Sequence, residues 1–252
     1  MAEKTTSRWF VHDKTGKDTP SRRLFCFPHA GGAPSAFRAW GRYLRPEFEL
    51  SIAQLPGRGA RMSEKPLDEM GALVEELITA MEPLLDKPFA LLGHSMGAWV
   101  AFEVARALGK KGLETPTLLF VAGARAPHIQ SRHPQVHVME DPQIMVLMKQ
   151  LGGTPASVLA DEGLMKRYVE VIRADHKIME LHVADPEPLP IPIVALAGSG
   201  DEQANLAEVQ GWMSHTARAF DFCSFPGQHF FLHERVPKMC REVKRHFNEA
   251  TG

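Results

Sequence analysis

The sequence contains little cysteine and no long apolar run. Its three cysteines, Cys26, Cys223 and Cys240, are too few and too widely spaced for a disulfide framework or a zinc site. We therefore expect them to be small buried side chains. No apolar stretch is long enough to span a membrane, and residues 1–8 lack the apolar core of a signal peptide. These absences predict a protein of the reducing cytoplasm without a membrane anchor.

An excess of charge of either sign is also missing. The 252 residues include 29 Lys and Arg against 30 Asp and Glu, which gives a formal net charge of −1 at pH 7. A dedicated nucleic-acid-binding protein normally carries a basic excess, so the sequence argues against that class. A hydrophobic fraction of 44% is ordinary for a globular protein and excludes a disordered or collagen-like chain. Because no repeat or linker divides the chain, we expect a single domain over residues 1–252.

Apolar strands and amphipathic helices alternate along the chain. The predicted strands cover about residues 24–27, 49–55, 89–92, 117–121, 193–197 and 219–225. The predicted helices cover about residues 35–44, 67–85, 99–108 and 236–247. This alternation is typical of an α/β fold with a mostly parallel sheet and helices on both faces.

One interval breaks this alternation. The stretch from Gly123 to Ile193 is far too long for a single crossover helix. It contains helix-start signals of its own at Asp141-Pro142 and Thr154-Pro155. We predict a helical cap over approximately residues 124–190, lying over one end of the sheet. The alternative is an independent helical subdomain with no role in the site.

The strongest chemical signal is a G-x-S-x-G sequence, Gly93-His94-Ser95-Met96-Gly97, between a predicted strand and a predicted helix. In this setting the serine lies on a strained turn, and the glycines avoid collisions with the neighbouring strand and helix. The hydroxyl is then exposed at a helix N-terminus, where the dipole and free amides favour developing negative charge. The pattern predicts Ser95 as a nucleophile.

A serine nucleophile needs a base and an acid that orients the base, which follow here in the order Ser, Asp, His. Asp201 follows the strand at residues 193–197, and the adjacent Glu202 is the alternative acid. His229 follows the last strand at the same expected sheet edge, with His233 and His94 as rival bases. We predict the triad Ser95, Asp201 and His229.

Two backbone N–H groups are predicted to stabilise the oxyanion of the reaction intermediate. One belongs to Met96, the residue after the nucleophile. The other belongs to Ala30, in the glycine-rich turn Pro28-His29-Ala30-Gly31-Gly32 after an early strand. This turn matches neither G-x-G-x-x-G nor G-K-[ST], so it is not a phosphate-binding loop.

Ordered motifs from about Trp9 to Phe247 extend the pattern beyond the serine turn. They are Arg8-Trp9-Phe10, Cys26-Phe27-Pro28-His29-Ala30-Gly31-Gly32, Leu55-Pro56-Gly57-Arg58-Gly59, Gly93-His94-Ser95-Met96-Gly97, Arg125-Ala126-Pro127 and Pro226-Gly227-Gln228-His229-Phe230-Phe231-Leu232. With them the chain resembles the type II, or external, thioesterases of polyketide and nonribosomal peptide assembly lines, which have the α/β-hydrolase fold. Two positions depart from that family: Glu202 follows Asp201 where a second aspartate is frequent, and Gln228 replaces a usual glycine.

The resemblance implies hydrolysis of stalled or wrongly loaded acyl groups from the phosphopantetheine arm of acyl- or peptidyl-carrier proteins, through an acyl-Ser95 intermediate. It implies no metal and no bound cofactor, because the pantetheine belongs to the substrate. Small acyl thioesters are expected substrates too, and a free-standing monomer is the expected state. Three alternatives remain: a carboxylesterase or lipase with the same triad, a non-catalytic binding module, and a terminal thioesterase domain that cyclises its product.

Two further pairs of residues carry hypotheses about the substrate. Met148 and Met179 lie in the predicted cap, where adaptable methionines could line an acyl chamber or simply pack the cap. Arg58 and Arg61 follow the second predicted strand, where arginines could dock the phosphate or acidic surface of a carrier protein. The alternative for Arg58 is that it bonds within its own loop.

Overall fold

The computed structural model describes residues 8–12, 19–154 and 156–252. Within them a seven-stranded sheet has the order β1-β3-β2-β4-β5-β6-β7. The strands are β1 (Phe10–His12), β2 (Arg22–Phe27), β3 (Phe48–Ala53), β4 (Phe89–His94), β5 (Leu118–Ala122), β6 (Ile193–Gly198) and β7 (Phe220–Phe225). All neighbouring pairs are parallel except β1 with β3. The predicted α/β class is confirmed, and only the short strand β1 was missed.

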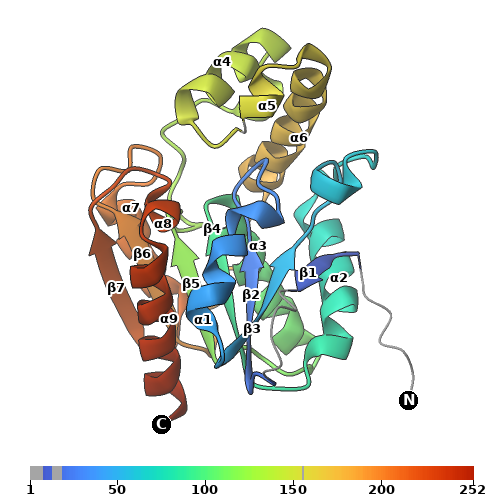
Figure 1. Cartoon of the computed structure of the whole chain (residues 1–252). Helices are drawn as coiled ribbons and strands as arrows, with labels where there is room; N and C mark the ends of the chain where they lie inside the picture. The colour runs from blue at the N-terminus through green and yellow to red at the C-terminus, as the bar shows by residue number, and fades with distance from the viewer. Residues whose placement is uncertain (1–7, 13–18, 155) are drawn as a thin grey trace.

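Helices cover both faces of this sheet (Figure 1). They are α1 (Gly41–Leu44), α2 (Met70–Met81), α3 (Met96–Lys110), α4 (Asp141–Leu151), α5 (Ala156–Leu159), α6 (Glu162–Leu181), α7 (Leu206–Gln210), α8 (Phe231–Glu234) and α9 (Val236–Thr251). Single 3-10 turns are η1 (Pro34–Ala36), η2 (Arg38–Trp40), η3 (Gly59–Arg61), η4 (Glu82–Leu84), η5 (Val136–Val138) and η6 (Gly211–His215). The helix expected at residues 35–44 is thus two 3-10 turns followed by the short α1. Within the described part of the chain, no helix is long and apolar enough to cross a bilayer.

Strand β2 shows why two separate layers form. Its side chains alternate between the faces, so Leu24 and Cys26 join one core cluster while Phe25 and Phe27 join the other. The first cluster packs α1 and α9 on one face, and the second packs α2 and α3 on the opposite face. Both faces are therefore buried, which explains why the central strands read as continuous apolar runs.

The long interval between β5 and β6 contains α4, α5 and α6. Figure 1 shows these helices above the carboxyl ends of the parallel strands, apart from the other helices. They share a small core of their own, which includes Ile144, Met148 and Val169. The end of α6 nearer the sheet instead belongs to the main core, through the buried Ile178. We call residues 124–190, the predicted helical insertion, the cap.

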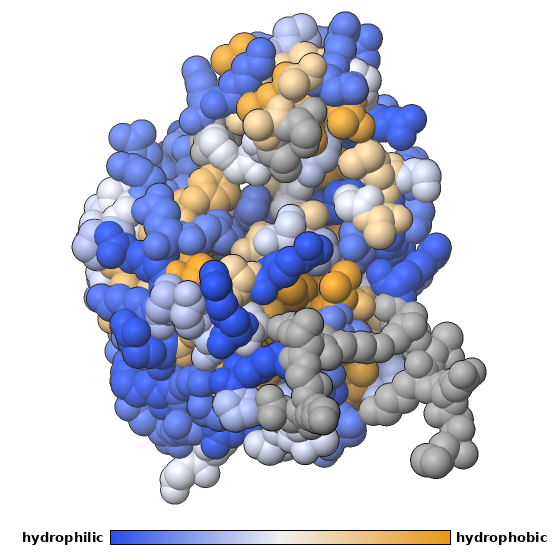
Figure 2. Space-filling model, in the orientation of Figure 1, coloured by the Kyte–Doolittle hydropathy of each residue, from blue (hydrophilic) through white to orange (hydrophobic). Residues whose placement is uncertain are grey.

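The surface of the cap differs in hydropathy from the surface of the rest of the molecule. In Figure 2 most of the visible surface is hydrophilic, and apolar residues reach it on the cap and where the cap meets the main body. Most of the large hydrophobic residues that are exposed also belong to residues 124–190. They are Val138, Val146, Leu159, Leu181 and Val183.

Candidate active site

The turn between β4 and α3 holds Ser95 in a conformation that side chains rarely adopt. Its φ is 55° and its ψ is −121°, and it is the one non-glycine residue with positive φ in the described ranges. Such strain costs on the order of 1–3 kcal/mol and persists where the surroundings enforce it. They do so here because a Cβ at Gly93 would lie 2.0 Å from the Gly97 oxygen, and one at Gly97 would lie 2.0 Å from the Phe27 oxygen. Strand, turn and helix thus pack in direct contact and present Ser95 at the sheet edge.

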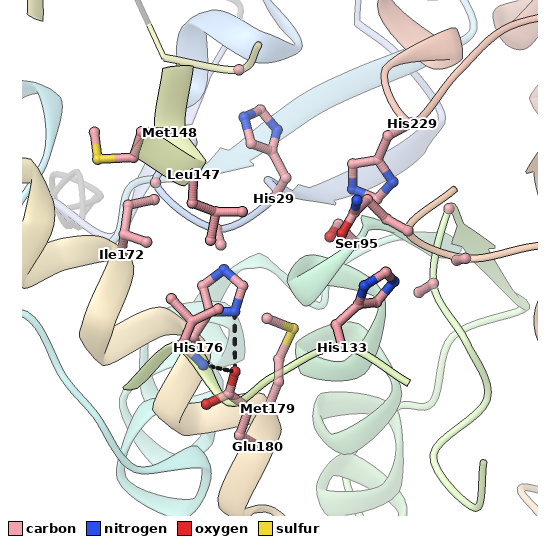
Figure 3. Close-up of a pocket in the computed structure, with 18 of the residues that line it drawn as sticks. His29, Ser95, His133, Leu147, Met148, Ile172, His176, Met179, Glu180 and His229 are labelled. Atoms are coloured by element: carbon pink, nitrogen blue, oxygen red, sulfur yellow. Dashed lines mark hydrogen bonds and ion pairs between the residues drawn. The ribbon is translucent and has the colours of Figure 1, made fainter. Parts of the chain in front are cut away.

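Asp201 and His229 meet at the same edge, after β6 and β7. His229 Nδ1 lies 2.9 Å from Asp201 Oδ2 and 3.1 Å from Oδ1. A carboxylate only accepts hydrogen bonds, so Nδ1 carries the proton and Nε2 keeps its lone pair. Asp201 Oδ1 also accepts from the N–H groups of Gln203 and Ala204, which fixes the buried carboxylate in place. Figure 3 shows Ser95 and His229 together in the pocket, with the imidazole next to the hydroxyl.

The rival residues occupy other positions. Glu202 is exposed, and its backbone oxygen accepts a hydrogen bond from Arg132. His94 is fully buried, and its Nε2 donates to the His229 backbone oxygen at 2.9 Å. Burial, together with the neighbouring histidines, holds the pKa of His94 well below its ordinary value. His94 thus supports the loop of His229 as a neutral ring, while Asp201 rather than Glu202 contacts His229.

Met96 and Ala30 are the two residues predicted to supply amides for the oxyanion. Met96 is the first residue of α3, so its N–H is one of those without an intrahelical acceptor. Ala30 lines the same pocket as Ser95, in the turn after β2. The next residue, Gly31, has a φ of +73° and donates its N–H to Asp175 Oδ2 at 2.7 Å. This bond fixes the turn against α6. The roles of these two amides stay predictions.

A pocket of about 230 Å³ separates this edge from the cap. Ser95, Ala30 and His229 line it from the sheet side. Met148 and Met179 line it from the cap, and Figure 3 shows Met179 pointing into it. Met148 is also part of the small cap core, so the two interpretations weighed for this residue apply together.

Besides Met179, which the sequence analysis proposed, helix α6 contributes three pocket residues that it missed: Tyr168, Ile172 and His176. Tyr168, Ile172, His176 and Met179 recur every three or four positions and all line the pocket. That spacing places them on one helix face, so the same periodicity that predicted the helix could have identified them. Glu180 follows on this face. Burial raises its pKa, but hydrogen bonds from His176, His137 and two backbone N–H groups outweigh burial and bring the pKa to about 2.

Arg58 and Arg61 lie in the interior, which contradicts the docking hypothesis. Arg58 is 1% exposed and pairs with Asp175 through Nη1–Oδ2 and Nη2–Oδ1 contacts of 2.5 and 2.8 Å. Arg61 is 5% exposed; it binds Glu64 and stacks over the Trp9 ring at 4.0 Å. Because a buried guanidinium cannot reach a partner surface, both arginines tie their own loop to the fold. Asp175 is 117 residues from Arg58, so no local signal announced this pair.

The chain is similar to known proteins in sequence and in structure. Residues 22–247 match the thioesterase domain family. The chain is 36% identical to gramicidin S biosynthesis protein GrsT of Aneurinibacillus migulanus over 243 residues, covering 94% of each protein. It is 35% identical to thioesterase PikA5 of Streptomyces venezuelae over 232 residues, covering 91% of this chain and 82% of PikA5.

Two solved structures extend the comparison. RedJ, a thioesterase from the prodiginine pathway of Streptomyces coelicolor, superposes with a TM-score of 0.82 at 36% identity and covers 91% of both chains. YbtT, a type II thioesterase from the yersiniabactin pathway, has a TM-score of 0.86 at 29% identity and covers 97% of this chain and 100% of its own. The chain therefore belongs to the thioesterase domain family and is a thioester hydrolase with the α/β-hydrolase fold.

Proposed function

We propose that the protein is a type II thioesterase that removes acyl groups from the phosphopantetheine arm of acyl- or peptidyl-carrier proteins. The observation that carries this proposal is the Asp201–His229 pair beside Ser95, at the base of a pocket that the cap closes on one side. The relatives add the biological setting. GrsT is named for gramicidin S biosynthesis, and YbtT is a type II thioesterase of a mixed peptide and polyketide pathway.

The first half-reaction acylates Ser95. His229 Nε2 takes the Ser95 proton while Oγ attacks the thioester carbonyl carbon, forming a C–O bond. Asp201 holds the ring in the required tautomer and stabilises the imidazolium. The N–H groups of Ala30 and Met96 stabilise the oxyanion. When the intermediate collapses, the C–S bond breaks and His229 returns its proton to the departing thiol.

The second half-reaction releases the acid. His229 takes a proton from water, and the resulting hydroxide oxygen attacks the acyl-Ser95 carbonyl. Collapse breaks the ester bond to Oγ, which regains its proton from His229. These steps use side chains and amides of this chain alone, and the pantetheine arm arrives and leaves with the carrier.

The pocket suggests the kind of acyl group. A volume of about 230 Å³ with methionine and isoleucine walls suits several short or medium chains rather than one rigid ligand. The buried positions of Arg58 and Arg61 leave carrier recognition to other residues. We further propose that the enzyme acts as a cytoplasmic monomer. Its sparse, free cysteines are compatible with a reducing compartment.

The test compares three substrates that share one acyl group: the acyl-carrier protein, the acyl-pantetheine thioester and the matching oxygen ester. We expect kcat/KM to fall in that order, with all three rates abolished by Ser95→Ala. An oxygen ester hydrolysed faster than both thioesters would overturn the proposal in favour of a carboxylesterase. A cyclised product from a long hydroxyacyl thioester would instead indicate a terminal thioesterase activity.

A further inference from the structure

Three histidines outside the proposed triad converge beside His229. His29 lies in the turn after β2, His94 ends β4 and His233 lies in α8. One ring nitrogen of each lies within 4.8 Å of those of the other two. The rings meet edge to face, with centroids 5.4 to 5.8 Å apart. Three elements distant in the sequence therefore direct imidazoles to one point of the sheet edge.

Each of these rings has a buried nitrogen that no described residue satisfies. The atoms are His29 Nδ1, His94 Nδ1 and His233 Nε2. Buried polar atoms are nearly always hydrogen-bonded, because leaving one unpaired costs stability. Since the three rings belong to one cluster, we consider a single species bound between them as the common partner of these atoms.

Backbone carbonyls set the tautomers of two of the rings. His94 Nε2 donates to the His229 oxygen, so its Nδ1 carries a lone pair. His233 donates to the Ala36 oxygen, which leaves the lone pair on Nε2. Histidines that bind metal ions almost always donate their other N–H to a carbonyl or carboxylate in this way.

All three rings are held neutral, which is the form that binds a cation. Burial is the main cause: it lowers the pKa of His29 to about 3, that of His94 well below its usual value, and that of His233 below its usual value. For His29 and His94 the neighbouring histidines lower the pKa further. No proton has to be displaced near neutral pH.

We propose that His29, His94 and His233 form a binding site for a divalent transition-metal ion, with zinc as the reference ion. Three imidazoles plus one water are a common ligand set for zinc. A cavity of about 250 Å³, lined by His29 and His233 among others, adjoins the cluster and supplies both the entry path and the water. Tetrahedral zinc sets ligand nitrogens about 3.3 Å apart. The ring nitrogens, which lie within 4.8 Å of one another, therefore have to move closer together around the ion.

The position of this site has a consequence for stability. The rings of His94 and His229 have centroids 5.1 Å apart, so the ion lies close to the proposed general base. Bound metal joins three elements of the sheet edge, and this stabilises the folded state by mass action.

The described residues contain one other group of three possible metal ligands, and it serves as the control. Asp221, Cys223 and His246 lie on β7 and α9. Its atoms already have protein partners, because Arg245 pairs with both Asp221 and His246. We expect this second group to bind a divalent cation weakly if at all.

The experiment uses the full chain without a histidine tag, treated with a chelator and dialysed. Zn²⁺ is titrated by calorimetry and Co²⁺ by visible absorption, with wild type, His233→Phe and His246→Gln in parallel. His233→Phe keeps an aromatic ring in place and removes the nitrogen. We expect one ion per wild-type chain, with the visible spectrum of four-coordinate Co²⁺. Loss of one of three ligands should weaken binding by on the order of 100-fold or more in His233→Phe, with no change in His246→Gln.

Melting temperature gives a second readout that requires no substrate, so it is independent of the thioesterase assignment. Zn²⁺ should raise the melting temperature of wild type and of His246→Gln, and leave that of His233→Phe unchanged. If His233→Phe does not fold, His29→Ala replaces it, because His29 lies in a turn and is partly exposed. Equal binding by wild type and the cluster variant would overturn the proposal. Absence of saturable binding to wild type would do so too, and would assign the orphan nitrogens to a buried water.

Discussion

The sheet edge and the cap meet at the same pocket, yet they are built by opposite means. At the edge, backbone contacts that only glycine allows hold Ser95, and hydrogen bonds fix Asp201 from two directions. The cap packs a small separate core rich in methionine and leaves large hydrophobic residues such as Val146 exposed. The sheet edge thus holds the proposed catalytic residues in a rigid frame, whereas the cap places adaptable methionine side chains beside the pocket.

One buried ion pair joins the two regions. Asp175 of α6 is fully buried, binds Arg58 in a bidentate pair and accepts the Gly31 N–H next to Ala30. Ile172 of the same helix fills the space above Gly31, where a Cβ would come within 2.7 Å of its Cδ1. The cap helix therefore supports the turn that presents a proposed oxyanion donor.

Substitutions of Ser95 and His229 at the sheet edge should cause the largest loss of activity. Ser95→Ala removes the nucleophile and should lower kcat/KM by on the order of 10⁴-fold or more, while the melting temperature stays near that of wild type. His229→Ala should cost about as much, because the residues act as a unit. Steady-state kinetics on an acyl-pantetheine thioester test both. An active His229→Ala beside an inactive His233→Ala would reverse the assignment of the base.

The acid gives the next largest effect. Asp201→Asn leaves His229 without its carboxylate partner and favours the wrong tautomer, which should lower kcat by on the order of 10²- to 10⁴-fold. Glu202→Gln is the matched control, since this side chain is exposed and should change kcat little. A larger loss in the control would make Glu202 the orienting acid.

Breaking the link between edge and cap should cost stability as well as activity. Arg58→Ala leaves the Asp175 carboxylate buried without its ion-pair partner, and removing one partner of such a pair costs about 3–5 kcal/mol. Lys110→Ala breaks the exposed pair with Asp185 and should cost about 0–1 kcal/mol. Denaturant unfolding measures both. Comparable small losses would show that the buried pair is not what secures the cap.

Substitutions of the cap methionines that line the pocket should have a smaller effect than the changes above. Met148→Phe or Met179→Phe narrows the pocket and should shift the preferred acyl group to a shorter chain, by on the order of tenfold in relative kcat/KM per few methylenes. Met213→Phe is the control, because Met213 is 63% exposed and is not among the residues lining the pocket. If the chain-length profiles of these variants match that of the control, Met148 and Met179 do not contact the acyl chain.

The smallest effect concerns acid stability of the cap. The depressed pKa of Glu180 contributes stability that is fully present above about pH 4.5 and is lost as pH falls towards about 2. Glu180→Gln should therefore flatten the fall in melting temperature over this window. The substitution also loosens η5 from α6, since Glu180 accepts N–H groups of Val136 and His137. An unchanged pH profile would assign the acid sensitivity to other carboxylates.

Much of the edge could be predicted from sequence because its signals are local. Strands β4, β6 and β7 are each followed by a turn that carries a triad candidate, and parallel strands align their carboxyl ends. Asp201 and His229 therefore had to lie near Ser95, although 28 residues separate them from each other. The sequence predicted that the cap is a helical insertion, but it did not identify most of the cap residues that line the pocket. Which of its residues face the pocket depends on how α6 lies across the sheet edge.

Local patterns in the sequence were enough to predict the serine turn, the strands that carry the triad candidates and the presence of a helical insertion, because spacing and backbone sterics act over a few residues. The burial and the partners of charged and titratable groups depend on the tertiary structure. The sequence left Arg58 open between carrier docking and bonding within its own loop, because its partner Asp175 lies 117 residues away. Likewise, His29, His94 and His233 lie on separate segments that meet only in the folded chain. Burial and pairing in a medium of low polarity set the role of such groups, and both depend on contacts that the chain makes only when folded.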